Sequence, residues 1–209
     1  MKRWIDELRS GDKIANLYRS ELDQGRVLLD VIRWMSDQDE LVYLTDDWEN
    51  PVFRHAIIDA AIDEGRLRVF PSYDTLSIAR GFDSETFLHF ILNAISRSRD
   101  SGYNHMIMMC EINWASSTDS WPQLVEFISL LDLVKLPGCP TIIMQYSTNV
   151  YSDKQIDTIH RVNQLVLEAG TLTRNFWIVS KPSPDGILAN AIKSPADRIN
   201  RLINDHSPG

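Results

Sequence analysis

Short apolar runs rich in β-forming residues alternate along this chain with longer stretches whose apolar residues recur at helical spacing. This alternation constrains the fold strongly, because a strand, a crossover helix and a second parallel strand form the repeating unit of α/β proteins. We therefore predict an α/β fold with a mainly parallel sheet and helices on both faces. The expected strands are Lys13–Tyr18, Leu41–Thr45, Leu67–Phe70, His105–Glu111, Thr141–Tyr146 and Phe176–Val179.

Capping residues and glycines mark the ends of the helices between these strands. Gly65, Gly102 and Gly170 are each predicted to end a helix, since glycine adopts the left-handed conformation at little cost. A strand is expected within a few residues of each glycine, so the predicted order is a strand and a helix repeated about five times, followed by a strand. The helix start signals are Ser20, Asn50 before Pro51, Asp83, Ser120 with Gln123, and Ser152 with Gln155.

Two connections and the C-terminal end depart from this compact pattern. Residues 71–82 and 112–120 form longer polar connections, and long loops at strand ends often cover ligand sites. From Lys181 onward, prolines precede one short amphipathic stretch, Ala196–Ile203. We predict a main domain over residues 1–180 and a C-terminal tail with one short helix over residues 181–209.

The overall composition limits the classes of function. The 209 residues are 44% apolar, which is enough for a globular core, and carry a net charge of −8. This acidic balance disfavours direct binding of nucleic acid, whose affinity depends largely on Lys and Arg at the phosphates. The two cysteines, the start of the chain and the lack of a long apolar run predict a cytoplasmic protein without a membrane span.

The first expected strand-to-helix turn, residues 19–26, has no phosphate-binding loop. Such a loop needs glycines whose backbone N–H groups surround the phosphates, a Lys for the β and γ oxygens, and a Ser or Thr for Mg²⁺. This turn carries Glu21 and Asp23 where the polyphosphate would lie. ATP hydrolysis at this turn is therefore disfavoured.

Ligands of parallel α/β sheets bind beyond the carboxyl ends of the strands, so the residues at those ends are candidates for a site. Here they are aromatic, carboxylate and amide side chains, which suit a small ligand with an apolar body and a polar group. Trp114 is expected to form an apolar wall, and Glu111 and Gln145 are expected to be polar anchors. The predicted ligand-binding residues are Tyr18, Asp46, Glu111, Trp114, Gln145 and Tyr146.

Catalytic and metal sites are not indicated. Glu111 ends an apolar strand, a position where some ATPases with parallel α/β sheets place an acid, but without a phosphate loop a structural bond or a ligand contact is favoured. Asp46 and Asp47 form a pair that suits Mg²⁺ or helix capping, and capping is the commoner role. The five histidines do not cluster, Cys110 is expected to be an inert core thiol, and no Gly-x-Ser-x-Gly motif occurs. We expect no catalytic residue, metal or cofactor.

Several short motifs together resemble the MEDS domain, the methanogen/methylotroph sensory domain. The resemblance spans residues 8–179 as a series of short matches. They are residues 8–13 (LRSGDK) with Tyr18, 41–46 (LVYLTD), 64–67 (EGRL), 81–83 (GFD), 102–103 (GY), 111–114 (EINW) and 145–146 (QY).

The resemblance implies a RecA/KaiC-like α/β fold with a degenerate phosphate loop. It also implies a sensory module that recognises simple hydrocarbon derivatives and works alone or joined to DNA-binding or histidine-kinase modules. One departure concerns two positions where many relatives carry His and Cys, because this chain has Lys13 and Met144 there. If those residues contact the ligand in relatives, this chain has lost that chemistry or binds a different compound.

The sequence thus predicts a non-enzymatic ligand-sensing domain for signal transduction or transcriptional control. Its expected partners are a small organic ligand and a signalling or regulatory protein, and self-association is expected by analogy with RecA relatives. Two alternatives remain open. One is a divergent RecA/KaiC-like ATPase that uses Glu111 and Asp46, and the other is a ligand-free interaction module that assembles through its tail.

Overall fold

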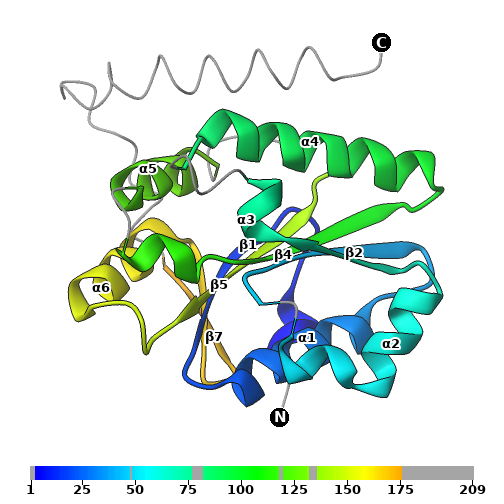
Figure 1. Ribbon diagram of the computed structural model, residues 1–209, viewed down its shortest axis with the longest axis horizontal. Coiled ribbons are helices and arrows are strands. Elements are labelled where there is room, and N and C mark those ends of the chain that lie inside the picture. Colours follow the sequence, from blue (N-terminus) through cyan, green and yellow to red (C-terminus); the bar gives the residue numbers. More distant parts are fainter. Residues whose placement is uncertain (1–2, 48, 77–81, 118–119, 132–135, 176–209) are drawn as a thin grey trace.

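Seven strands form one sheet in the order β3-β2-β4-β5-β1-β6-β7 (Figure 1). The computed structural model describes residues 3–47, 49–76, 82–117, 120–131 and 136–175. The first six strands of this order are mutually parallel, and β7 runs antiparallel to β6. The strands are β1 Lys13–Tyr18, β2 Asp39–Thr45, β3 Leu67–Pro71, β4 His105–Glu111, β5 Thr141–Ser147, β6 Leu165–Glu168 and β7 Thr171–Arg174.

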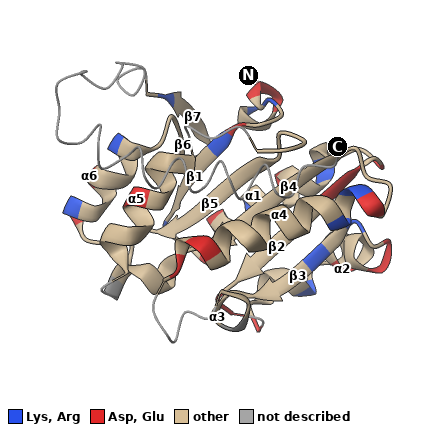
Figure 2. Ribbon diagram, turned by 90° about the horizontal axis from the view of Figure 1, so that it is seen from above, with Lys and Arg blue, Asp and Glu red and all other residues tan. Residues whose placement is uncertain are grey.

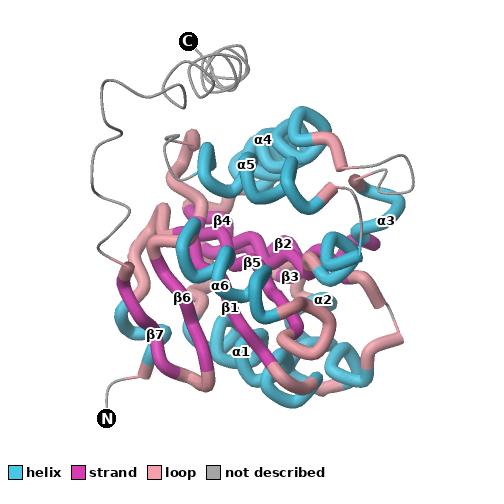
Figure 3. Tube along the Cα trace, turned by 90° about the vertical axis from the view of Figure 1, so that its left-hand side faces the viewer, coloured by secondary structure: helices cyan, strands magenta, loops and turns pink. Residues whose placement is uncertain are grey.

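Helices cover both faces of this sheet, as Figures 1 and 3 show. One face packs on α1 (Glu21–Trp34), α2 (Ala56–Asp63) and η1 (Trp4–Glu7). The other packs on α4 (Ser84–Asp100), α5 (Trp121–Leu131) and α6 (Asp153–Val162). Shorter turns are η2 (Pro51–Arg54), α3 (Ser72–Thr75) and η4 (Asn113–Ser117).

The central strands are buried on both sides because each face has its own layer of helices. In β4, Ile107 and Met109 pack toward α1 and α2, whereas Met106, Met108 and Cys110 pack toward α4 and α5. This alternation follows from the two-residue repeat of a strand, and burial of both faces explains why the central strands are mostly apolar in sequence. The predicted α/β fold with a mainly parallel sheet is confirmed.

Most local predictions are confirmed at the residue level. β1 and β4 have the predicted bounds, and β2, β3 and β5 extend the predicted strands by one or two residues. Ser20, Asp83 and Ser152 each accept a backbone N–H in the first turn of their helix, and Ser152 forms a capping box with Gln155.

Two other predicted helix starts differ in detail. Asn50 caps the 3-10 turn η2, whose first residue is Pro51, rather than an α-helix. Ser120 directly precedes α5, and its hydroxyl accepts a hydrogen bond from the backbone N–H of Phe82. Ser120 therefore joins the start of α5 to the segment before α4.

The prediction for Gly170 is wrong. It does not end a helix, because α6 already ends at Val162 and the chain then forms β6 and β7. Ala169 and Gly170 have φ values of 49° and 76°, and this left-handed pair makes the two-residue turn of a β-hairpin. Gly65 and Gly102 do end helices, with φ values of 73° and 89°.

The predicted strand Phe176–Val179 and the predicted tail over residues 181–209 lie outside the described residues, so the domain boundary stays a prediction. No helix in the described ranges is both long and apolar enough to cross a membrane.

Candidate functional site

All six sequence-predicted site residues lie at or beside the carboxyl edge of the sheet. Tyr18 and Glu111 end β1 and β4, and Asp46 directly follows β2. Gln145 and Tyr146 lie near the end of β5, and Trp114 lies in η4. The topology thus places them at one edge, but their environments differ.

Glu111 is the centre of a buried hydrogen-bond network. Its Oε1 accepts bonds from Gln24 Nε2 at 2.6 Å, the Tyr43 hydroxyl at 2.8 Å and Thr45 Oγ1 at 3.2 Å. Its Oε2 accepts the backbone N–H of Asp46 at 2.9 Å. Burial raises the pKa of Glu111, and these donors offset part of the rise. The network joins the first turn of α1 to β2 and β4.

A row of polar side chains crosses the sheet beside this network. Gln145 of β5 is in register with Asn16 of β1 and Glu111 of β4, and its Nε2 donates to the Tyr43 hydroxyl at 3.3 Å. Asn16 Nδ2 and Gln145 Oε1 are buried and have no hydrogen-bond partner within the described part of the chain. A buried polar group without a partner costs about 1–3 kcal/mol. The row therefore holds hydrogen-bonding capacity that the described fold does not use.

Asp46 is a second, partly buried carboxylate beside Glu111. Burial, and then the charge of Glu111, raise its pKa to about 7, while the Ser72 hydroxyl and the backbone N–H groups of Asn113 and Trp114 oppose the rise. Its Oδ2 accepts the Asn113 N–H at 3.1 Å. Its Oδ1 and Ser72 Oγ are both buried and make no well-formed hydrogen bond to a described residue. Asp46 can therefore take up a proton near neutral pH.

Asn113 ties three strand ends together and was not among the predicted site residues. Its backbone N–H bonds to Asp46, its Nδ2 donates to the Tyr18 hydroxyl at 2.6 Å, and its Oδ1 accepts the Ser147 N–H at 2.9 Å. Its position just after β4 was the available signal, but which strand ends it joins depends on the strand order. Asn113 therefore links the carboxyl ends of β1, β2 and β5 by hydrogen bonds.

Trp114 and Tyr146 are packed in the hydrophobic core on the α4 and α5 side. Trp114 is 5% exposed, and its ring stacks on Phe82 with centroids 5.6 Å apart. Tyr146 is fully buried, with its hydroxyl on Met144 Sδ and its ring 5.5 Å from that of Tyr151. Ligand contact by these two aromatic residues stays a prediction.

The first turn of α1 is shaped by capping and packing. Ser20 Oγ donates to Asp23 Oδ2 at 2.9 Å and accepts the Asp23 N–H. The single glycine of this helix, Gly25, packs against η2, since a Cβ there would lie 2.6 Å from Val52 Cγ2. Neither feature forms a cradle for phosphate.

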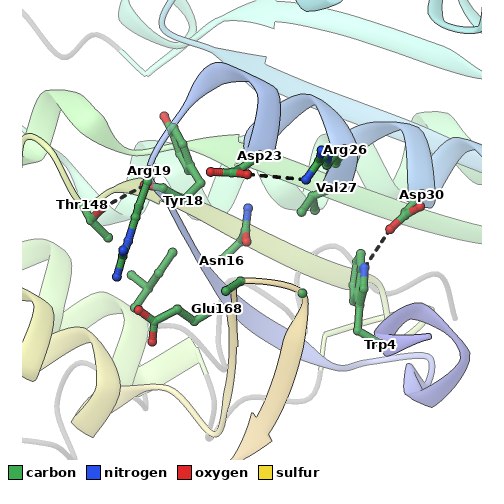
Figure 4. Close-up of a pocket in the computed structure, with 13 residues that line it drawn as sticks. Trp4, Asn16, Tyr18, Arg19, Asp23, Arg26, Val27, Asp30, Thr148 and Glu168 are labelled. Carbon is green, nitrogen blue, oxygen red and sulfur yellow. Dashed lines mark hydrogen bonds and ion pairs between the residues drawn. The ribbon is translucent and has the colours of Figure 1, made fainter. Parts of the chain in front are cut away.

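A cavity of about 300 Å³ opens between α1, the ends of β1 and β6, and the β6–β7 turn (Figure 4). Of the predicted site residues, Tyr18 is the one that lines it. In Figure 4 Asn16 lies centrally, with Arg19 and Thr148 toward one end and Trp4 and Asp30 toward the other. The lining is Trp4, Asn16, Leu17, Tyr18, Arg19, Asp23, Arg26, Val27, Asp30, Thr148, Glu168, Ala169 and Gly170.

The remaining chemistry-bearing residues occupy structural positions. Cys110 is buried, which raises the pKa of its thiol, and the described residues contain no group of three His, Cys, Asp or Glu that could hold a metal. Lys13 lies at the opposite end of β1 and donates to the carbonyl of Leu131, while Met144 packs in the core. Neither of the two departing positions lines the cavity.

Comparison with known proteins agrees with this architecture. No curated protein matches the chain. A solved structure, that of a KaiC-like protein from the hyperthermophilic archaeon Pyrococcus horikoshii, is similar with a TM-score of 0.52 and 12% identity. The match covers 77% of this chain and 73% of that one, and at this identity it shows the KaiC-like fold alone.

The sequence model of the MEDS family, described as a methanogen/methylotroph, DcmR sensory domain, matches residues 14–164. This chain therefore belongs to the MEDS family of sensory domains.

Proposed function

We propose that this protein is a non-enzymatic sensor that binds a small hydrocarbon derivative at the carboxyl ends of its strands. It passes the signal to a partner protein that acts in signal transduction or controls transcription. The membership in a sensory family supports the sensing role, and the cavity beside β1 and β6 supports the place of binding.

The observation that carries this proposal is the contrast between two neighbouring parts of the carboxyl edge. Where a RecA-like ATPase would hold polyphosphate, the first turn of α1 carries the Ser20–Asp23 cap, and Asn113 joins the neighbouring strand ends. On the β6 side of this turn the cavity is open, and it is lined by Asp23 and by a buried amide, Asn16, that has no Nδ2 partner in the described ranges. This arrangement suits a small organic molecule better than a nucleotide.

The divergent ATPase remains a weaker alternative. Glu111 and Asp46 are the acids that it would use, but Glu111 already accepts four hydrogen bonds from the protein. A carboxylate held in this way is poorly placed to orient water or Mg²⁺.

The test is a thermal-shift scan of the full chain. The panel contains Mg²⁺-ATP, methanol, methylamines, methyl thiols, and short halogenated or carboxylated hydrocarbons. A ligand at a hundred times its Kd adds about 2.7 kcal/mol, which raises the Tm of a domain of this size by about 5–10 °C. A shift with an organic compound alone supports the sensor, and a shift with Mg²⁺-ATP contradicts it. The absence of any shift favours the interaction module.

From the membership in a sensory family, we also propose a cytoplasmic location, a protein partner and self-association. Figure 2 shows Lys and Arg interspersed with Asp and Glu over the described elements, which supports a protein partner rather than direct contact with nucleic acid.

Light scattering of the full chain and of a chain ending before Lys181 tests whether the tail is needed for self-association. Loss of assembly with unchanged ligand binding would assign self-association to residues 181–209.

A further inference from the structure

The cavity beside α1 is separate from the buried network of Glu111. Its walls are the first half of α1, the ends of β1 and β6, the β6–β7 turn and Trp4 (Figure 4). A volume of about 300 Å³ lies at the lower end of the range for small-molecule sites. The space therefore suits a compact molecule.

Asn16 supplies a polar group that the fold itself leaves unused. It is 2% exposed, it lies in register between Gln145 of β5 and Leu167 of β6, and its Nδ2 has no partner among the residues that the structure describes. Buried amides in folded proteins are nearly always hydrogen-bonded to protein, water or ligand. A molecule in the cavity can complete the hydrogen bonds of this amide.

The charges around the cavity are of both signs and incompletely paired. Arg26 lies 4.0 Å from Asp23, which leaves Arg19 as a lining cation without an ion pair to any described residue. Asp30 accepts the Trp4 indole N–H at 2.9 Å, and Glu168 lies 3.9 Å from His160. No described Lys or Arg forms an ion pair with either of these carboxylates, although the charge of Asp30 also acts on Arg3. Among the described residues, the cavity thus offers one cation without an ion pair and two acids.

We propose that this cavity binds a short-chain amino acid or a similar small zwitterion. Its carboxylate would lie at Arg19, its amine at Asp30 or Glu168, and its hydrocarbon part against Trp4 and Val27. A ligand with only a carboxylate would be repelled by the excess of acidic groups. A ligand with only an amine would leave Arg19 without an ion pair among the described residues. This inference rests on the proposed sensing function and names its site and ligand class.

The first test is isothermal titration of the full chain with ω-amino acids of two to six carbons. Alkylamines and alkanoates of equal chain length are the matched probes. We expect at least one amino acid to bind at least tenfold more tightly than either matched probe. Equal binding of a matched probe would overturn the ligand class. So would binding of another compound from the thermal-shift panel when no amino acid binds.

The second test uses two variants, Asn16→Leu and Arg19→Gln, with Arg33→Gln on the exposed side of α1 as control. We expect each cavity variant to weaken binding at least tenfold and the control to bind normally. Arg19 is exposed, so its variant remains informative if Asn16→Leu does not fold. Normal binding in both cavity variants would place the ligand elsewhere and leave the sensing function intact. If no compound in either panel binds, the sensing function itself fails.

Discussion

The Glu111 carboxylate accepts the backbone N–H of Asp46 at 2.9 Å, so a buried acid and a partly buried acid lie side by side at the ends of β4 and β2. Neither acid forms an ion pair within the described residues. The free energy of folding must therefore depend on their protonation.

The pKa of Asp46 predicts that stability falls as pH rises. Its folded pKa is about 7 and its ordinary value is 3.8, so the folded state binds more protons between these values. The stabilisation is complete below about pH 4 and is lost as pH rises through 7. At 1.36 kcal/mol per pKa unit this amounts to about 4 kcal/mol at most. The raised pKa of Glu111 acts in the same direction.

Urea unfolding of the wild type and Asp46→Asn from pH 5 to pH 8 tests this dependence. The neutral amide resembles the protonated acid, so the variant should gain stability over the wild type as pH rises. Asp47→Asn, at the neighbouring exposed position, should show no such trend. A constant difference between Asp46→Asn and the wild type would show that Asp46 does not titrate in this range.

Glu111→Gln should destabilise the protein by about 1–3 kcal/mol, because the new amide N–H₂ would face donors that now bond to a carboxylate. Chemical denaturation measures the change, and Glu126→Gln on the exposed face of α5 is the control. If stability is unchanged but Mg²⁺-ATP binding is lost, Glu111 is an ATPase residue and the structural role is wrong.

Asn113→Ala should open the carboxyl edge locally. It removes the acceptor of the Ser147 N–H and the donor to the Tyr18 hydroxyl, at a cost of about 2 kcal/mol. Hydrogen exchange should become faster at Ser147 than in the wild type, while the core of β4 stays protected. Unchanged exchange at Ser147 would refute the role of Asn113 as a tie between strand ends.

Gly25→Ala should destabilise the protein although alanine favours helices. The added Cβ would lie 2.6 Å from Val52 Cγ2, and relieving this overlap should cost about 1–3 kcal/mol. Val52→Ala in the same chain should restore most of the loss, which a double-mutant cycle measures. Additive effects of the two substitutions would exclude this contact as the reason for the glycine.

Trp114→Ala distinguishes a core residue from a ligand wall. Its burial and its stacking on Phe82 predict a loss of about 3–5 kcal/mol in the free energy of unfolding. The ligand-wall hypothesis instead predicts an intact fold without a ligand-induced thermal shift. Thermal unfolding with and without a panel compound that binds the wild type separates the two outcomes.

Local sequence signals were sufficient where the physics is local. The caps at Ser20, Asp83 and Ser152 depend on residues within one turn, and the strands β1 and β4 depend on short runs of mostly apolar residues. The signal at Gly170 is also local, and it was ambiguous. Glycine suits both a helix end and a hairpin turn, and the four residues of β6 are too few to show a period.

The sequence by itself determined the α/β class and the lack of a phosphate loop. It also determined the helix boundaries at most of the capping residues. Tertiary structure decided which polar residues meet. Asn16, Gln145 and Glu111 form one row because β1, β5 and β4 are neighbours in the sheet, although they lie far apart along the chain. The same packing buried Trp114 and left the cavity beside α1, because side-chain environments depend on which elements come together in space.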